Sequence, residues 1–402
     1  MNKADIIQAA FRIWGRDLYQ TTSLTQLARE LGVSKPALYR HFKNKQTLLD
    51  AMYASFFDEY AALIKAGYER VLTARNKKEG LFNMVRTLAV YYTGNVYAFI
   101  FSLVQVYGSL EDDNLRNELA FRGVDLNRFL SLYVETSEYP PMLQMLTATT
   151  MFWTACFHKN AGSLETPPSE SRIRTDIAFL EAKLSRGLGL RREQVEAIDY
   201  GALEQAVFAA GFEDAENDAL LRAVAGAVAE AGPWQASMEM VARRSGLSKS
   251  GLYAHFKSRR DMLNRFFLTE FDRILTYAEA NIHKSTVPEE QLYLWILSIA
   301  NYFRTHPELL AALDWLRTRR IDLGLTAPPR LHMIFWDIKL DMFPPPEEAP
   351  SSPDWFPQWI IFMIINTPIG VGGGGGGGAE IPDNSVRILY RFITLGLEGF
   401  DP

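Results

Sequence analysis

Apolar side chains recur along most of this chain at a spacing of three or four residues. The first such run lies within residues 1–20 and carries Ile6, Ile7, Ala10, Phe11 and Trp14. That spacing is typical of amphipathic helices, and no run alternates apolar and polar residues as a half-exposed strand does. Prolines and glycines separate the runs. The pattern therefore predicts an all-α protein.

One helical segment occurs twice. A shift of 214 residues aligns residues 27–43 with residues 241–257, and ten of the 17 positions are identical. The identical positions are Ala28, Arg29, Gly32, Ser34, Lys35, Leu38, Tyr39, His41, Phe42 and Lys43 with their counterparts. Weaker similarity follows downstream, because residues 179–190 and 390–400 each carry an aromatic residue followed by Leu-Gly-Leu. We interpret the chain as a duplication of a two-part domain.

The repeat predicts the domain organisation. A chain of 402 residues, 48% of them hydrophobic, is long enough to build more than one core. We expect a small N-terminal helical domain, called the first head, at residues 1–62, followed by a larger helical domain at 63–190. A linker at 191–216 then leads to the second head at 217–278 and a second larger helical domain at 279–402.

The first head contains the signals of two short helices joined by a tight turn. Ser23, followed three residues later by Gln26, is a helix-capping pair, and Gly32 is a helix terminator. Ser34 caps the next helix, and Pro36 stands in its first turn, where its missing N–H costs nothing. This arrangement is typical of a helix-turn-helix.

The second of these helices has two unlike faces. Leu38 and Phe42 are four residues apart and are expected to be buried. The other face carries a proline, an aromatic hydroxyl and cations: Lys35, Pro36, Tyr39, Arg40 and Lys43. Such a face suits the major groove of DNA. The alternative is a solvated helix in which Tyr39 and His41 make only local hydrogen bonds.

The charge is distributed unevenly. The net charge of the chain is −5, which by itself argues against a nucleic-acid partner. However, residues 27–45 carry a net charge of +4 and residues 241–260 a net charge of +6. Two compact basic patches on an acidic chain are what local phosphate binding requires.

The segment LARELGVSKPALYRHFKNKQTLLDA, residues 27–51, resembles the DNA-binding domain of tetracycline repressor (TetR) family regulators. The resemblance covers about 60 residues in each half. It rests on Ala28, Gly32, Val33, Ser34, Leu38, Tyr39, His41, Phe42, Lys45 and Leu48. It implies two such units fused in tandem and double-stranded DNA as a partner.

The resemblance also implies which residues contact DNA. In the first head, Lys35, Pro36, Ala37, Tyr39, Arg40 and Thr25 would face the bases, and Ser23, His41 and Lys45 the phosphates. In the second head the matching residues are Lys249, Ser250, Gly251 and Tyr253, with Ser237, His255 and Arg259 for the phosphates. Ala254 stands where the first head has Arg40, and Glu239 where it has Thr25. We therefore expect the two heads to read bases differently.

The family further implies a ligand pocket and a four-helix dimer interface in the remaining helices. By position, the interface helices are residues 141–161, 172–190, 354–370 and 383–400. Because each half supplies a pair, we expect the interface to form within one chain as a pseudo-dimer; the alternative is a homodimer of tandem chains. The pocket candidates are aromatic residues and histidines: Phe99, Phe101, Tyr107, Trp153, Phe157, His158, Trp295, Trp315, His332 and Trp336. Each of them also suits an ordinary core.

Other classes of function find little support. The sequence lacks the common hydrolase, metalloprotease and nucleotide-binding motifs, and its six histidines show no metal spacing, so no enzyme, metal or cofactor is expected. The glycine tract at residues 372–378 follows no strand, and we interpret it as a loop. No apolar run reaches about 20 residues, so no membrane partner is expected. A single cysteine and the absence of a signal-peptide pattern are expected of a cytoplasmic protein.

The sequence thus predicts a transcriptional regulator, expected to act as a repressor, that holds a pseudo-palindromic operator with two unlike heads. A small apolar or aromatic effector is expected to release it. The alternative is a ligand sensor or partner-binding module whose heads no longer bind DNA specifically.

Overall fold

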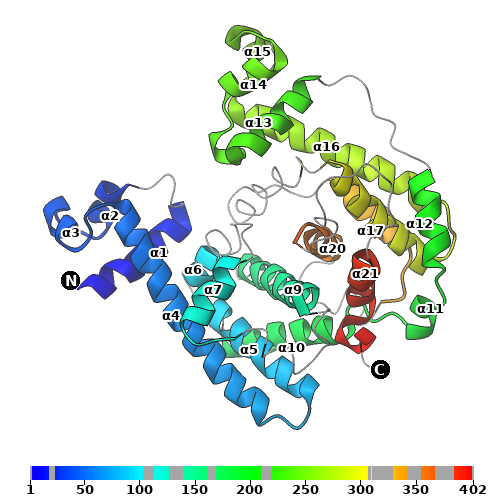
Figure 1. Ribbon diagram of the computed structural model, residues 1–402, viewed down its shortest axis with the longest axis horizontal. Helices are drawn as coiled ribbons and strands as arrows, with labels where there is room; N and C mark the ends of the chain where they lie inside the picture. Colours follow the sequence, from blue (N-terminus) through cyan, green and yellow to red (C-terminus); the bar gives the residue numbers. More distant parts are fainter. Residues whose placement is uncertain are drawn as a thin grey trace. The chain divides into compact units, whose positions relative to one another are not determined.

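The computed structural model describes residues 2–17, 23–102, 113–125, 128, 139–160, 169–209, 219–306, 309, 329–342, 355–366 and 384–400. In these residues the regular structure is helical and contains no strand, which confirms the predicted all-α class (Figure 1). The chain divides into two compact units. The first comprises Met1–Pro140 and Phe157–Glu181, and the second comprises Pro141–Cys156 and Ala182–Pro402. No described helix is long and apolar enough to cross a bilayer.

The first unit contains the first head and the long helices that follow it (Figure 1). Its helices are α1 (Lys3–Asp17), α2 (Leu24–Glu30), α3 (Lys35–His41), α4 (Lys45–Leu72), α5 (Lys77–Gly94), α6 (Val96–Phe101) and α7 (Asp113–Phe121). Two further helices, α9 (Tyr139–Asn160) and α10 (Glu170–Arg186), are shared between the units. Aromatic rings connect these helices: Phe11 of α1 and Phe56 of α4 lie 4.9 Å and 5.5 Å from Phe101 of α6.

The second unit is built around one helix whose central residues are all buried. Its helices are α11 (Arg192–Glu196), α12 (Tyr200–Ala209), α13 (Ala219–Gln235), α14 (Met238–Ser245), α15 (Lys249–His255), α16 (Arg259–Ile282), α17 (Pro288–Thr305), α19 (Pro329–Asp337), α20 (Trp355–Asn366) and α21 (Ser385–Leu395), with a 3₁₀ turn at Gly396–Phe400. Every residue of α17 from Leu292 to Phe303 is buried. Helices α12, α16, α20 and α21 pack around it, and a helix that is apolar on all sides needs such neighbours.

The helices predicted to form the interface coincide closely with α9, α10, α20 and α21. Within the second unit, Trp153 of α9 packs 6.0 Å from Trp359 of α20, and the Trp359 indole N–H donates to the Thr149 hydroxyl (3.3 Å). The ends of α10 and α21 meet through their backbones. The amides of Leu188 and Gly189 donate to the carbonyls of Ile393 (2.7 Å) and Thr394 (3.0 Å). The first Leu-Gly-Leu segment of the repeat therefore contacts the residues directly before the second.

The predicted linker, residues 191–216, is helical and packed in its described part. Helices α11 and α12 occupy residues 192–196 and 200–209, and α12 packs on α17. Glu204, only 3% exposed, accepts hydrogen bonds from the Tyr293 hydroxyl (2.6 Å) and the Arg387 guanidinium (2.6 and 2.8 Å). The charged and alanine-rich composition suggested a connector, but one of its acids anchors three helices. The boundaries of the domain prediction, those of the linker included, stay predictions.

Glu204→Ala is expected to lower the free energy of unfolding of the second unit by about 2 kcal/mol, because a buried hydroxyl and a half-buried guanidinium lose their acceptor. Burial raises the pKa of this carboxyl, but the hydrogen bonds from Arg387 and Tyr293 outweigh it and hold the pKa below its usual value. The control is Glu196→Ala, because Glu196 is exposed and its ion pair with the half-buried Arg391 is longer (3.2 Å); it should cost less than about 1 kcal/mol. Urea unfolding followed by tryptophan fluorescence measures both. Equal losses would contradict the anchoring role.

Candidate nucleic-acid interface

Local hydrogen bonds set the ends of the two short helices in the first head. The Ser23 hydroxyl accepts from the Gln26 amide (3.2 Å) and caps α2, and the Ser34 hydroxyl accepts from the Ala37 amide (3.3 Å) and caps α3. Gly32 lies between them at a φ of +64°, a left-handed conformation that glycine adopts without strain. The structure thus contains the predicted helix-turn-helix at the predicted residues (Figure 1).

The buried face of α3 fixes its orientation on the head. Leu38 is fully buried and Phe42 is 2% exposed, among the core residues of α1, α2 and α4: Ile6, Ala10, Trp14, Leu24, Leu27, Leu48 and Met52. The opposite face is open. Lys35, Pro36, Tyr39 and Arg40 are exposed and Ala37 is half-buried. The Lys35 ammonium lies 5.7 Å from the centre of the Tyr39 ring, within the range of a cation–π interaction.

The second head repeats this construction. Ser237 caps α14 and Ser248 caps α15, and Gly246 turns the chain between them at a φ of +70°. Leu252 is fully buried, whereas Lys249, Ser250 and Tyr253 are exposed and Gly251 is half-buried. Both heads therefore present the same kind of surface: a short helix with an exposed lysine and tyrosine, held by an apolar core.

The residues predicted to contact phosphates differ in burial and in the partners they already have. His41 and His255 are exposed, and the hydroxyls of Ser23 and Ser237 already accept helix amides. Lys45 and Arg259 are half-buried, and burial lowers the pKa of each. The Lys45 ammonium lies 5.9 Å from the Trp14 ring, and Arg259 Nε donates to the Ala236 carbonyl (2.6 Å). Each of these two cations therefore also makes a contact inside its own head. Thr25, on α2, is exposed.

The cations of the two heads have different partners. In the second head, Lys249 forms an ion pair with Glu239, and Arg244 forms one with Glu230 on α13. In the described part of the first head, no carboxylate is ion-paired with the matching Lys35 or with Arg40. The sequence showed that Glu239 replaces Thr25, but the pairing itself depends on the turn between α14 and α15 and becomes evident only in the structure.

Most of the pocket candidates are described, and Phe99 and His158 are neighbours, with ring centroids 5.5 Å apart. Phe99, Phe101, Trp153, Phe157 and Trp295 are buried, and His332 and Trp336 are half-buried. His158 Nε2 makes a hydrogen bond (3.0 Å) with the Tyr92 carbonyl, and burial lowers the pKa of the imidazole. Tyr107, Trp315 and the glycine tract lie outside the described residues. A small hollow in the second unit is lined by Phe267, Glu270, Phe271, Ile274, Phe303 and Leu309.

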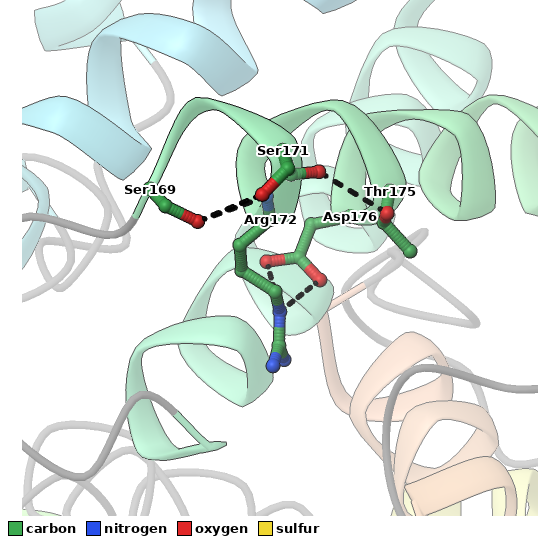
Figure 2. Close-up of polar contacts among 5 residues, drawn as sticks. All are labelled: Ser169, Ser171, Arg172, Thr175 and Asp176. Atoms are coloured by element: carbon green, nitrogen blue, oxygen red, sulfur yellow. Dashed lines mark hydrogen bonds and ion pairs between the residues drawn. The ribbon is translucent and has the colours of Figure 1, made fainter.

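The sequence pattern did not predict a polar cluster that lies at the start of α10 (Figure 2). Figure 2 shows the Arg172 side chain beside that of Asp176, one turn further along the helix, and Nε donates to both carboxylate oxygens (2.8 and 3.0 Å). Asp176 is 2% exposed, so burial raises the pKa of its carboxyl although Arg172 opposes the rise. These contacts lie within the start of α10, and no group of three potential metal ligands occurs in the described residues.

The two heads match one family model twice. The model described as "Bacterial regulatory proteins, tetR family" matches residues 6–52 and again residues 220–266. The two matches are separated by the same 214 residues as the repeat in the sequence. Each match spans the first helix, the helix-turn-helix and the start of the long fourth helix of its head.

Proposed function

Because the chain carries two tandem units of the tetR family of DNA-binding transcriptional regulators, we propose that it binds one operator with both heads and represses transcription there. The observation that carries this proposal is the pair of exposed recognition helices, α3 and α15, each with a lysine and a tyrosine on its open face. Two such heads contact two half-sites of one duplex. The bases would be contacted by the residues predicted above, with Lys35 and Lys249 as the shared cations.

The operator is pseudo-palindromic, since the heads are unlike. Arg40 offers a bidentate donor that Ala254 lacks, and Pro36 corresponds to Ser250. Guanine is the base that arginine contacts most often. The half-site of the first head is therefore expected to contain a guanine that the other half-site does not require.

The two heads belong to one pseudo-dimer in this proposal. Its support is the packing of α20 on α9 and the backbone contacts between the ends of α10 and α21, all within the second unit of a single chain. Binding of a small apolar or aromatic effector to the helical domains would release the operator, which the aromatic lining of the hollow near Phe267 and Phe303 supports.

Selection of bound DNA from a random library tests the proposal. We expect an imperfect palindrome with two unlike halves, and a solution mass close to that of one chain by light scattering. A perfectly symmetric site with a doubled mass would instead indicate a homodimer. Binding that weakens with salt and shows no sequence preference would favour a sensor or partner-binding module whose heads no longer bind DNA specifically.

Arg40→Ala and Lys45→Ala are expected to weaken DNA binding in different ways. Arg40→Ala should cost about 1–3 kcal/mol on the preferred site and relax the preference at one position. Lys45→Ala should weaken binding to all sequences alike and reduce the salt slope by about 1. Titration of operator variants at several salt concentrations measures both. Equal losses on every operator variant for Arg40→Ala would contradict base reading.

A further inference from the structure

An acidic residue stands on the recognition surface of the second head. Glu239 is the only acid between residues 236 and 260, and it lies in the first turn of α14. Its carboxylate forms an ion pair with Lys249, the first residue of the recognition helix α15. The Glu239 and Lys249 side chains are 52% and 57% exposed. The pair is therefore accessible from the side of the head on which α15 presents Tyr253.

The first head places the same cation in a different setting. Lys35 matches Lys249, but Thr25 stands where the second head has Glu239. Lys35 lies over the ring of Tyr39 instead of pairing with an acid. The first head therefore presents an exposed lysine donor alone. The second head, with Glu239 in place of Thr25, presents a lysine donor and a carboxylate acceptor side by side.

Neither the stability of the second head nor its general affinity for DNA explains why a carboxylate stands on the recognition surface. An exposed ion pair contributes at most about 1 kcal/mol to folding. A negative charge on a surface that approaches phosphates weakens binding to every sequence. The acid therefore benefits the head only if a particular base offers it a hydrogen-bond donor.

We propose that Glu239 and Lys249 act as one unit that reads a G·C base pair in the major groove, an inference that rests on the DNA-binding function proposed above. Guanine presents two neighbouring acceptors, O6 and N7, and the cytosine paired with it presents the N4 amino donor beside them. The Lys249 ammonium donates to guanine and the Glu239 carboxylate accepts from cytosine. An A·T pair instead places its donor between two acceptors and adds the thymine methyl group.

The pair is ready to make these contacts without being broken. An ammonium has three donors and a carboxylate about four acceptor sites, and their mutual bond uses one of each. The hydrogen bond from Lys249 holds the pKa of the Glu239 carboxyl below its usual value, so the group remains an acceptor at neutral pH. The Ser237 hydroxyl makes a smaller contribution to this lowered pKa.

The test compares two substitutions that remove the same charge from the same head. Glu239→Gln changes the proposed reader, and Glu230→Gln changes the acid that pairs with Arg244 away from the recognition helix. In selection from a random DNA library, the unmodified protein should prefer G·C about tenfold at one position of one half-site. Glu239→Gln should abolish that preference and favour adenine, the partner of glutamine. Glu230→Gln should leave every base preference unchanged.

A transfer experiment supplies the complementary result. Thr25→Glu places a carboxylate beside Lys35 and should create a G·C preference of similar size in the other half-site. If Glu239→Gln raises affinity for all sequences equally and leaves the base preferences unchanged, the pair only masks Lys249 and the inference is wrong, although the proposed function stands. If the unmodified protein selects no DNA sequence, both the inference and the proposed function are wrong.

Discussion

Gly187→Ala is expected to destabilise the second unit by about 3–5 kcal/mol. Gly187 follows α10 at a φ of +57°, a conformation that costs an alanine about 1 kcal/mol. A Cβ at this position would also lie against the Ile393 carbonyl and 2.8 Å from the Gly396 amide nitrogen. The obstacle is backbone, so no rotamer change relieves it, and the hydrogen bonds that join the ends of α10 and α21 must give way.

The matched control is Gly246→Ala in the same unit. Gly246 has a φ of +70°, but a Cβ there would meet nothing within 4 Å. Gly246→Ala should therefore lower the free energy of unfolding by about 1 kcal/mol, the conformational cost alone. Urea unfolding followed by the fluorescence of the buried tryptophans compares the two variants. Similar losses for both would show that the two helix ends do not approach as closely as described.

Lys183→Met is expected to stabilise the second unit by about 3 kcal/mol at pH 7. Lys183, on α10, is fully buried, its ammonium donates to the Gly187 carbonyl (3.1 Å), and it lies 4.9 Å from the Phe356 ring. Burial, with a smaller contribution from Arg186, lowers the pKa of this lysine from 10.5 to about 7. Methionine fills a similar volume without a charge to desolvate. The lost hydrogen bond offsets about 1 kcal/mol of the gain.

The stabilisation by Lys183→Met should decrease as the pH rises above 7. Because the folded pKa lies below the unfolded one, the unfolded chain binds the extra proton between about pH 7 and pH 10.5. The lysine therefore lowers stability fully below pH 7, and its penalty diminishes as the pH rises. The difference between Lys183→Met and the unmodified protein should shrink by about 1.4 kcal/mol per pH unit over this window. A difference that stays constant from pH 7 to pH 9.5 would contradict the lowered pKa.

The helix-turn-helix was predictable almost residue by residue. Its caps, Ser23 and Ser34, and its terminator, Gly32, act on groups within four residues of themselves, so the printed sequence contains the whole interaction. The repeat added a second, independent copy at Ser237, Ser248 and Gly246. The packed helices α11 and α12 were not predictable in the same way, because Glu204 is held by residues far along the chain.

The sequence by itself determined the all-α class, the duplication, the ends of the short helices and the family of the two heads. It did so because helical periodicity, capping and turn chemistry are local. Only the tertiary structure decided that the first Leu-Gly-Leu segment contacts the end of α21, that Lys183 is buried against Phe356, and that Lys249 pairs with Glu239. Each of these depends on which side chains the packed helices bring together. In the second head, that packing places an acceptor beside a cation that the first head presents without one.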